Sequence, residues 1–114
     1  MTPNVAFGMI NVGSALLFAA LNAPLKMRRV KMNSFYGFRI KKSFESEKTW
    51  YAINAYAGKQ GLLWSIPIFL AGLACFFVPI ENPNGLKGFV AGIGPTGICL
   101  SIAIARILAY AKRL

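Results

Sequence analysis

Few residues in this 114-residue chain have side chains suited to catalysis. The sequence has no histidine and no aspartate, and its carboxylates are Glu45, Glu47 and Glu81. This composition excludes a Ser-His-Asp triad, an imidazole base and a histidine metal site. The topology derived below puts Glu81 on the other side of a membrane from Glu45 and Glu47, which disfavours a paired-carboxylate active site. The sequence therefore favours a protein that is not an enzyme, with no cofactor and no metal.

The two cysteines are the remaining candidates for metal or redox chemistry. Cys75 and Cys99 both lie in apolar runs, where a cysteine usually acts as a small buried hydrophobic residue. Their distances from the expected helix ends differ by about six residues, or roughly 9 Å at the rise of an α-helix. We therefore expect neither a disulfide nor a shared metal between them.

The elements that must position these side chains are three runs without charge, at about 5–25, 62–80 and 88–105. Each has about the 20 residues that a helix needs to cross a bilayer. Basic residues follow the first run rather than precede it, which is typical of a retained span and not of a signal peptide. With 56% hydrophobic and 14% charged residues, the chain is predicted to be an all-α membrane protein with one domain over residues 1–114.

The distribution of basic residues predicts the orientation. The segment 26–60 holds nine Lys and Arg, whereas 81–87 holds one and the C-terminal end holds three. By the positive-inside rule, 26–60 is a cytoplasmic basic loop of a bacterial inner membrane protein, with the N-terminus outside and the C-terminus inside. The net charge of +10 then favours anionic lipid headgroups as a partner, rather than direct binding of nucleic acid.

Small residues recur every four positions in two of the spans, at Ala15 and Ala19 in the first and at Gly97 and Ser101 in the third. Such spacing lets helix backbones approach closely in lipid. We favour helix packing within the bundle over a dimer face. For Asn11, on the first of these faces, a hydrogen bond between helices is the favoured role.

The basic loop carries its own pattern. Ser43 can cap a helix, and Trp50 and Ile53 share one face of residues 43–59. This pattern predicts a short amphipathic helix that lies in the membrane interface and turns into the second span at Gly58 and Gly61.

The order of several loop residues resembles the signature of the SdpI/YfhL family of bacterial membrane proteins. The matching residues singled out as a binding or structural signature are Asn33, Gly37, Phe38, Arg39, Ser43, Trp50, Asn54 and Gly58. Ile40 departs from the pattern, because the family usually carries Thr there. With the flanking spans, the resemblance extends over nearly the whole chain.

The resemblance implies a function in binding. The named member of the family confers immunity on cells that make a secreted peptide toxin, and it signals by holding a transcriptional repressor at the membrane. By resemblance, the partner would be a peptide toxin or a regulator. The alternative is a small accessory subunit of a larger membrane complex, and a transporter or lipid-modifying enzyme is least favoured. Arg39 is either an anchor, to phosphate or to a neighbouring helix, or a contact for a partner.

Overall fold

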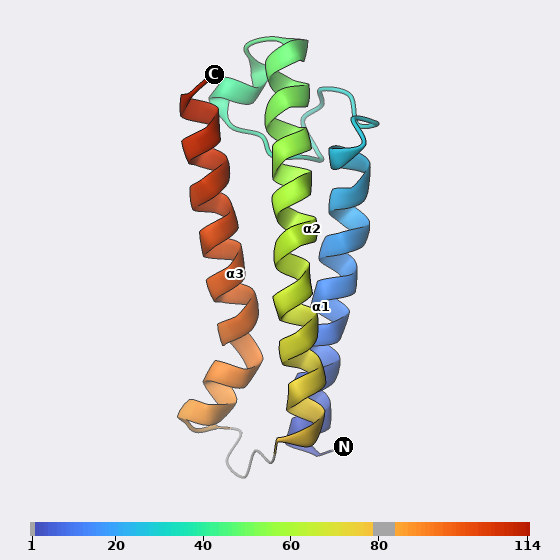
Figure 1. Cartoon of the computed structure of the whole chain (residues 1–114), viewed down its shortest axis with the longest axis vertical. Coiled ribbons are helices and arrows are strands. Elements are labelled where there is room, and N and C mark those ends of the chain that lie inside the picture. The colour runs from blue at the N-terminus through green and yellow to red at the C-terminus, as the bar shows by residue number, and fades with distance from the viewer. Residues whose placement is uncertain (1, 79–83) are drawn as a thin grey trace.

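The computed structural model describes residues 2–78 and 84–114, and these form three long α-helices. A folded loop joins the first two at one end of the bundle (Figure 1). The helices are α1 (Pro3–Lys26), α2 (Glu47–Phe77) and α3 (Leu86–Lys112), and the loop contains the short 3-10 helix η1 (Lys41–Phe44). The second span was expected to end at residue 80. That end, and the turn that holds Glu81, lie outside the described residues.

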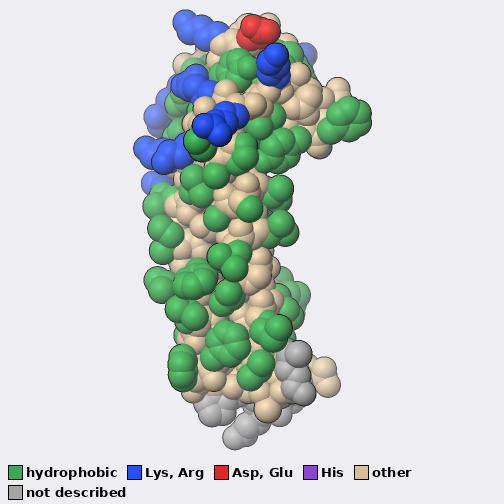
Figure 2. Space-filling model, turned by 90° about the vertical axis from the view of Figure 1, so that its right-hand side faces the viewer, with side chains coloured by type: hydrophobic (Ala, Val, Ile, Leu, Met, Phe, Trp, Pro, Cys, Tyr) green, Lys and Arg blue, Asp and Glu red, His purple; other side chains and the backbone are tan. Residues whose placement is uncertain are grey.

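All three helices are long and apolar enough to cross a membrane. Large hydrophobic side chains point outward along each of them, among them Leu17, Leu70 and Ile98, which are 58 to 62% exposed. Figure 2 shows such side chains covering the flank of the molecule below a group of Lys and Arg at the loop end. A chain with this surface can be solvated only by lipid along its flank, and we conclude that it is a multi-pass membrane protein with an all-helical fold.

The expectation of a separate interfacial helix is wrong. Residues 47–59 belong to α2, which runs without interruption through Gly58 and Gly61 to Phe77. Ser43 is not the helix cap either, because Ser46 occupies that position and its side chain accepts a 3.0 Å bond from the backbone N–H of Thr49. At about 1.5 Å per residue α2 is roughly 46 Å long, so its first turns extend beyond the ~30 Å hydrocarbon core.

The part of α2 before its uncharged run packs against α3. Helix α3 is likewise longer than its own uncharged run. Ile53 and Ala57 of α2 pack with Ile107 and Ala111 of α3 in one buried cluster, and the rings of Tyr56 and Tyr110 stack 4.2 Å apart. The third span was expected to end at residue 105. The helix continues to Lys112, about two further turns, because Ile107 and Ala111 bury their side chains against α2.

The face of α3 that packs in the bundle differs from the expected one. Its buried residues near the loop end are Cys99, Ala103, Ile107 and Ala111, whereas Ser101 is exposed and Gly97 is only half-buried. Positions 101 and 103 are two residues, or about 200°, apart around a helix. The small-residue stripe on α3 therefore faces away from the bundle. On α1 the prediction is closer, since Ala15 is buried and Ala19 half-buried.

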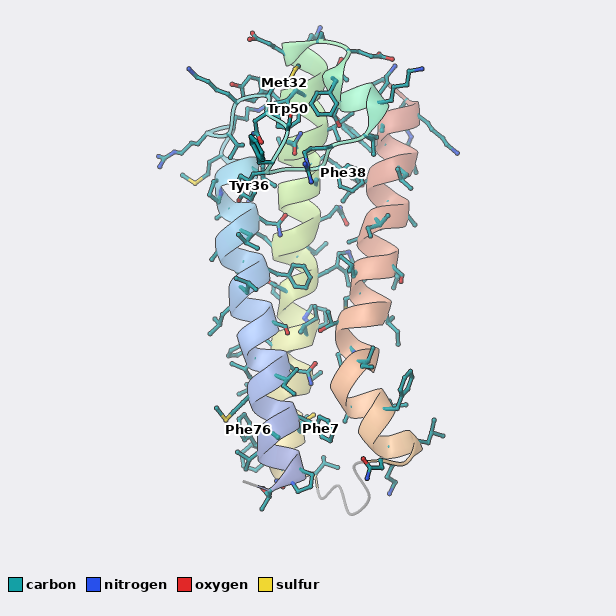
Figure 3. All side chains as sticks on the ribbon, turned by 180° about the vertical axis from the view of Figure 1, so that it is seen from behind. Phe7, Met32, Tyr36, Phe38, Trp50 and Phe76 are labelled. Atoms are coloured by element: carbon teal, nitrogen blue, oxygen red, sulfur yellow. The ribbon has the colours of Figure 1, made fainter. Side chains whose placement is uncertain are left out.

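The pairing of α1 with α3 is uneven along the bundle. In the half away from the loop, Asn11 is fully buried and its Nδ2 donates 2.7 Å to the backbone carbonyl of Ala91 in α3. This contact confirms the expected hydrogen bond between helices. Phe7, labelled in that half in Figure 3, lies against Gly92 of α3. Toward the loop end no comparable bond joins the two helices within the described residues.

Candidate functional site

Asn33 forms a tight turn near the start of the loop between α1 and α2. The Asn33 side-chain oxygen accepts bonds from the backbone N–H groups of Phe35 at 2.8 Å and Tyr36 at 2.6 Å, and its Nδ2 donates to the carbonyl of Lys31. An asparagine side chain that bonds its own backbone two and three residues on forms a tight turn. Asn33 therefore shapes the loop locally.

Gly37 brings the loop onto α2. Its φ of +121° lies in a region that residues with a side chain rarely adopt. A Cβ at this position would also lie 2.7 Å from Oδ1 of Asn54 and 3.2 Å from the ring of Trp50. Both the backbone conformation and the space therefore require glycine, and the next residue, Phe38, is placed against α2.

Asn54 is the centre of the contact between loop and helix. Its side chain is 2% exposed, its Oδ1 accepts a 2.6 Å bond from the Phe38 N–H, and its Nδ2 donates to the carbonyls of Trp50 at 3.0 Å and of Phe38 at 3.4 Å. The amide thus bonds both backbone groups of Phe38, as a neighbouring strand would. Buried backbone groups need such partners, so Asn54 fixes this part of the loop.

Ser43 and Trp50 complete the arrangement, which we call the loop clamp: Gly37, Phe38, Ser43, Trp50 and Asn54. The Ser43 hydroxyl is fully buried and donates a 2.7 Å bond to the Phe38 carbonyl. Trp50 is also fully buried, and its Nε1 donates 2.9 Å to the carbonyl of Val30 near the end of α1. Trp50 of α2 thus holds the start of the loop, and Asn54 of α2 together with Ser43 of η1 holds its middle.

Arg39 lies outside the loop clamp. Its side chain is exposed and its guanidinium donates to the backbone carbonyl of Ser34 within the same loop. No bond from Arg39 to α2 or another helix is found among the described residues. Sequence reasoning also missed Tyr36 as a site residue, although its hydroxyl donates to the Leu21 carbonyl of α1. Nothing in the sequence pattern marks that long-range backbone contact.

Gly58 holds α1 close to α2 just below the loop. A Cβ at Gly58 would collide with the backbone N of Lys26 and would lie 2.7 Å from the carbonyl oxygen of Asn22, and one at Gly61 would collide with the Asn22 side chain. The two glycines that were expected to make a turn instead permit the close approach of two helices.

Between α1 and α3, under the loop, lies a groove of about 400 Å³. We call it the α1–α3 groove. Its walls and floor are almost entirely apolar, and they include Leu21, Leu25, Ala57, Leu100, Ala103 and Ile107. Phe35, Tyr36, Gly37 and Phe38 line it at the loop end. Figure 3 shows Tyr36 and Phe38 at that end of the bundle, on the side where α1 and α3 face the viewer. The loop clamp therefore fixes one wall of a groove that opens toward lipid.

The loop end of the bundle is strongly basic. Nine of the Lys and Arg residues lie between 26 and 60, and Figure 2 shows several of them grouped there. In the part of the chain that the structure describes, the ion pair found is Lys42 with Glu45, 3.2 Å apart. Most of this positive charge is thus left to interact with molecules outside the chain.

No group of acidic, His or Cys side chains suited to a metal occurs among the described residues.

The fold and the site define a class: a three-span membrane protein with a clamped basic loop over an apolar groove. A comparison with protein families gives the particular family. The model of the SdpI/YfhL protein family matches residues 29–110, which contain the loop, α2 and most of α3, and the chain belongs to this family. No curated protein and no solved structure matches the chain.

Proposed function

We propose that the protein acts by binding, as an SdpI-like factor in toxin immunity or in membrane signalling. The observation that carries the proposal is the loop clamp, in which Asn54 bonds both backbone groups of Phe38. A clamped loop presents its exposed basic and aromatic side chains in one conformation, and such preorganisation lowers the entropic cost of binding. The absence of His and Asp from the sequence further supports a role without catalysis.

The proposal includes an orientation. We propose that the chain lies in the bacterial inner membrane with the loop end in the cytoplasm, the N-terminus outside and the C-terminus inside. Nine basic residues in 26–60 against one in 81–87 support it. A reporter fused after Leu114 should then read as cytoplasmic and one inserted at 81–87 as external. A periplasmic signal from a fusion at Lys41 contradicts this orientation.

Immunity is tested in a toxin-sensitive bacterial strain that lacks its own family members. Cells that express this chain, or carry an empty vector, are challenged with the secreted peptide toxin that the named family member counters. We expect survival only with the chain. Signalling is tested in the same cells with a fluorescent fusion of the repressor that the named member holds, which should move to the membrane. If the chain is present in the membrane and produces neither survival nor recruitment, the proposal is wrong.

The second candidate is a small accessory subunit of a larger membrane complex. The exposed face of α3 favours it: a shallow groove beside Gly97 and Ser101 is lined by Phe89, Ile93 and Ile98 and has no partner within the described chain. Small residues on a lipid-facing surface permit a further helix to pack closely. Purification in a mild detergent tests this candidate, because a larger protein recovered in equal amounts supports it and recovery of the chain alone opposes it.

A further inference from the structure

The length and lining of the α1–α3 groove suit a lipid chain. From Ile107 to Leu100, the wall formed by α3 extends over seven residues, or about 10 Å at 1.5 Å per residue. The lining is almost entirely apolar, and the groove opens on the flank of the bundle that lipid solvates. An extended hydrocarbon chain of the bilayer can therefore lie in it.

The position of the groove also fits a lipid. A much smaller cavity of about 20 Å³, lined by Trp64, Ile68 and Cys99, lies next to it on the side away from the loop. The groove alone covers about 10 Å along α3, within the ~15 Å thickness of the hydrocarbon in one leaflet. The α1 wall, Phe18 to Leu25, lies in the uncharged run that crosses the membrane. An acyl chain in this leaflet can thus enter sideways without leaving the hydrocarbon.

Arg39 supplies a charged group at the loop end of the groove. Its guanidinium donates to the Ser34 carbonyl, directly before Phe35, which is a wall residue. A guanidinium has five N–H donors, and no carboxylate pairs with Arg39 in the described residues. The remaining donors match the two oxygens of a phosphate, which arginine binds bidentately. The surplus of basic residues in 26–60 adds attraction for any anion there.

We propose that the α1–α3 groove is a binding site for one anionic phospholipid of the leaflet at the loop end. One acyl chain lies between α1 and α3 over Ala57 and Gly61, and the phosphate bonds Arg39. A hydrophobic peptide is the other class of occupant, and the guanidinium of Arg39, which no carboxylate pairs in the described residues, favours the anionic lipid instead. The inference does not depend on the toxin or regulator role.

The test uses the full chain purified in a mild detergent and native mass spectrometry with added phosphatidylglycerol or phosphatidylcholine, both with palmitoyl and oleoyl chains. Both headgroups carry a phosphate, but only phosphatidylcholine also carries a cationic trimethylammonium group, which opposes binding beside Arg39. We therefore expect a first phosphatidylglycerol to bind about tenfold more tightly than phosphatidylcholine. Arg39→Gln should remove that preference. Lys41→Gln, which removes the same charge from an exposed position in the same loop, should change affinity less than twofold.

A second pair of variants tests the groove itself. Ala103→Phe puts a ring into it and should weaken the first lipid at least tenfold, whereas Ala105→Phe, on the exposed face of the same helix, should not. If Ala103→Phe does not fold, the Arg39 and Lys41 pair still decides the matter. Equal binding of the two lipids, or an equal loss in Arg39→Gln and Lys41→Gln, overturns the proposal. So does a photo-crosslinking side chain at Leu100 that, in cells, captures polypeptide and no phospholipid.

Discussion

The two sides of α1 are packed in opposite ways near the loop. On one side Gly58 and Gly61 bring the backbone of α2 against Asn22 and Lys26. On the other side α3 stands off, and the α1–α3 groove separates the two helices. Farther from the loop α1 and α3 meet again, through the bond from Asn11 to Ala91.

The difference shows that α1, the loop and α2 form one closely packed unit, along which α3 docks mainly on α2. The clusters that hold α3 near the loop join Ile107 and Ala111 to Ile53 and Ala57 of α2. Glycine at the α1–α2 contact lets the two helices meet closely, whereas Ile107 of α3 packs against α2 and leaves the α1–α3 groove open. Substitutions at these contacts can therefore sharpen or abolish the contrast.

Gly58→Ala should have the largest effect. The added methyl group would meet the backbone of Lys26 and Asn22, which cannot rotate away as a side chain can. We expect a loss of about 3 kcal/mol in stability, at the upper end for overpacking, measured by thermal unfolding in detergent. The matched control is Gly13→Ala, where a Cβ meets nothing within 4 Å. A Gly58→Ala melting temperature equal to that of the control would show that α1 and α2 are not in this tight contact.

Asn54→Ala should follow, at about 2 kcal/mol, because it leaves the buried N–H of Phe38 without its acceptor. Amide hydrogen exchange at Phe38 should accelerate together with the fall in melting temperature. Arg39→Ala is the control. Its exposed side chain makes one bond to its own loop, so the change in stability should stay within about 0.5 kcal/mol. A larger loss for Arg39→Ala than for Asn54→Ala would return the anchoring role to Arg39.

Asn11→Ala tests the place where α1 and α3 do meet. Loss of its bond to the Ala91 carbonyl should cost about 1 kcal/mol, typical of a polar contact between membrane helices. Ser101→Ala serves as the comparison, because the Ser101 hydroxyl bonds only Gly97 of its own helix at the exposed face and its removal should be nearly neutral. Identical melting curves for the two variants would mean that the Asn11 bond contributes nothing to the pairing.

Controls aside, Ala103→Leu should have the smallest effect, because its longer side chain can extend into the groove. We expect a change within about 1 kcal/mol of the wild-type stability. The same substitution at Ala15, which is 2% exposed and packs with Ile68, should cost about 2 kcal/mol by overpacking. A similar loss of stability at the two positions in thermal unfolding would contradict the contrast between the closely packed α1–α2 side and the open α1–α3 groove.

The spans could be predicted from the sequence because lipid excludes charge over about 20 residues. α1 begins and ends within two residues of the expected limits. The start of α2 could not be found in this way. The charge-free run begins only after Lys59, but α2 begins at Glu47 because a helix can continue outside the membrane. The packing of Ile53 against Ile107 supports this extension, and it joins residues far apart in the sequence. The turn expected at Gly58 and Gly61 was wrong for a similar reason, because glycine occurs both in turns and at close contacts between helices.

The sequence pattern singled out residues of the loop, but it did not give their hydrogen-bond partners. Asn54 and Gly37 stood out by their order in the chain, whereas the bond from the Phe38 backbone to Asn54 depends on a fold that no spacing encodes. Arg39 was given the anchoring role as one of two alternatives because a charge near a bilayer needs an acceptor. In the structure the acceptor of Arg39 is the backbone carbonyl of Ser34, in the same loop. The contact from α2 to the start of the loop is made by Trp50, which donates to the Val30 carbonyl. The stripe on α3 shows that small residues reveal a surface suited to packing without telling which partner uses it.

The loop clamp also has a consequence for biogenesis. The bonds that close it join residues 16 and 20 positions apart, Phe38 with Asn54 and Val30 with Trp50, whereas the bond from Asn11 to α3 joins residues 80 positions apart. Contacts between near neighbours in a chain form early, and a growing polypeptide folds from its N-terminal side. The hairpin of α1, loop and α2 therefore contains the hydrogen bonds that stabilise it before α3 has been synthesised. We expect α3 to pack afterwards against a hairpin that has already folded.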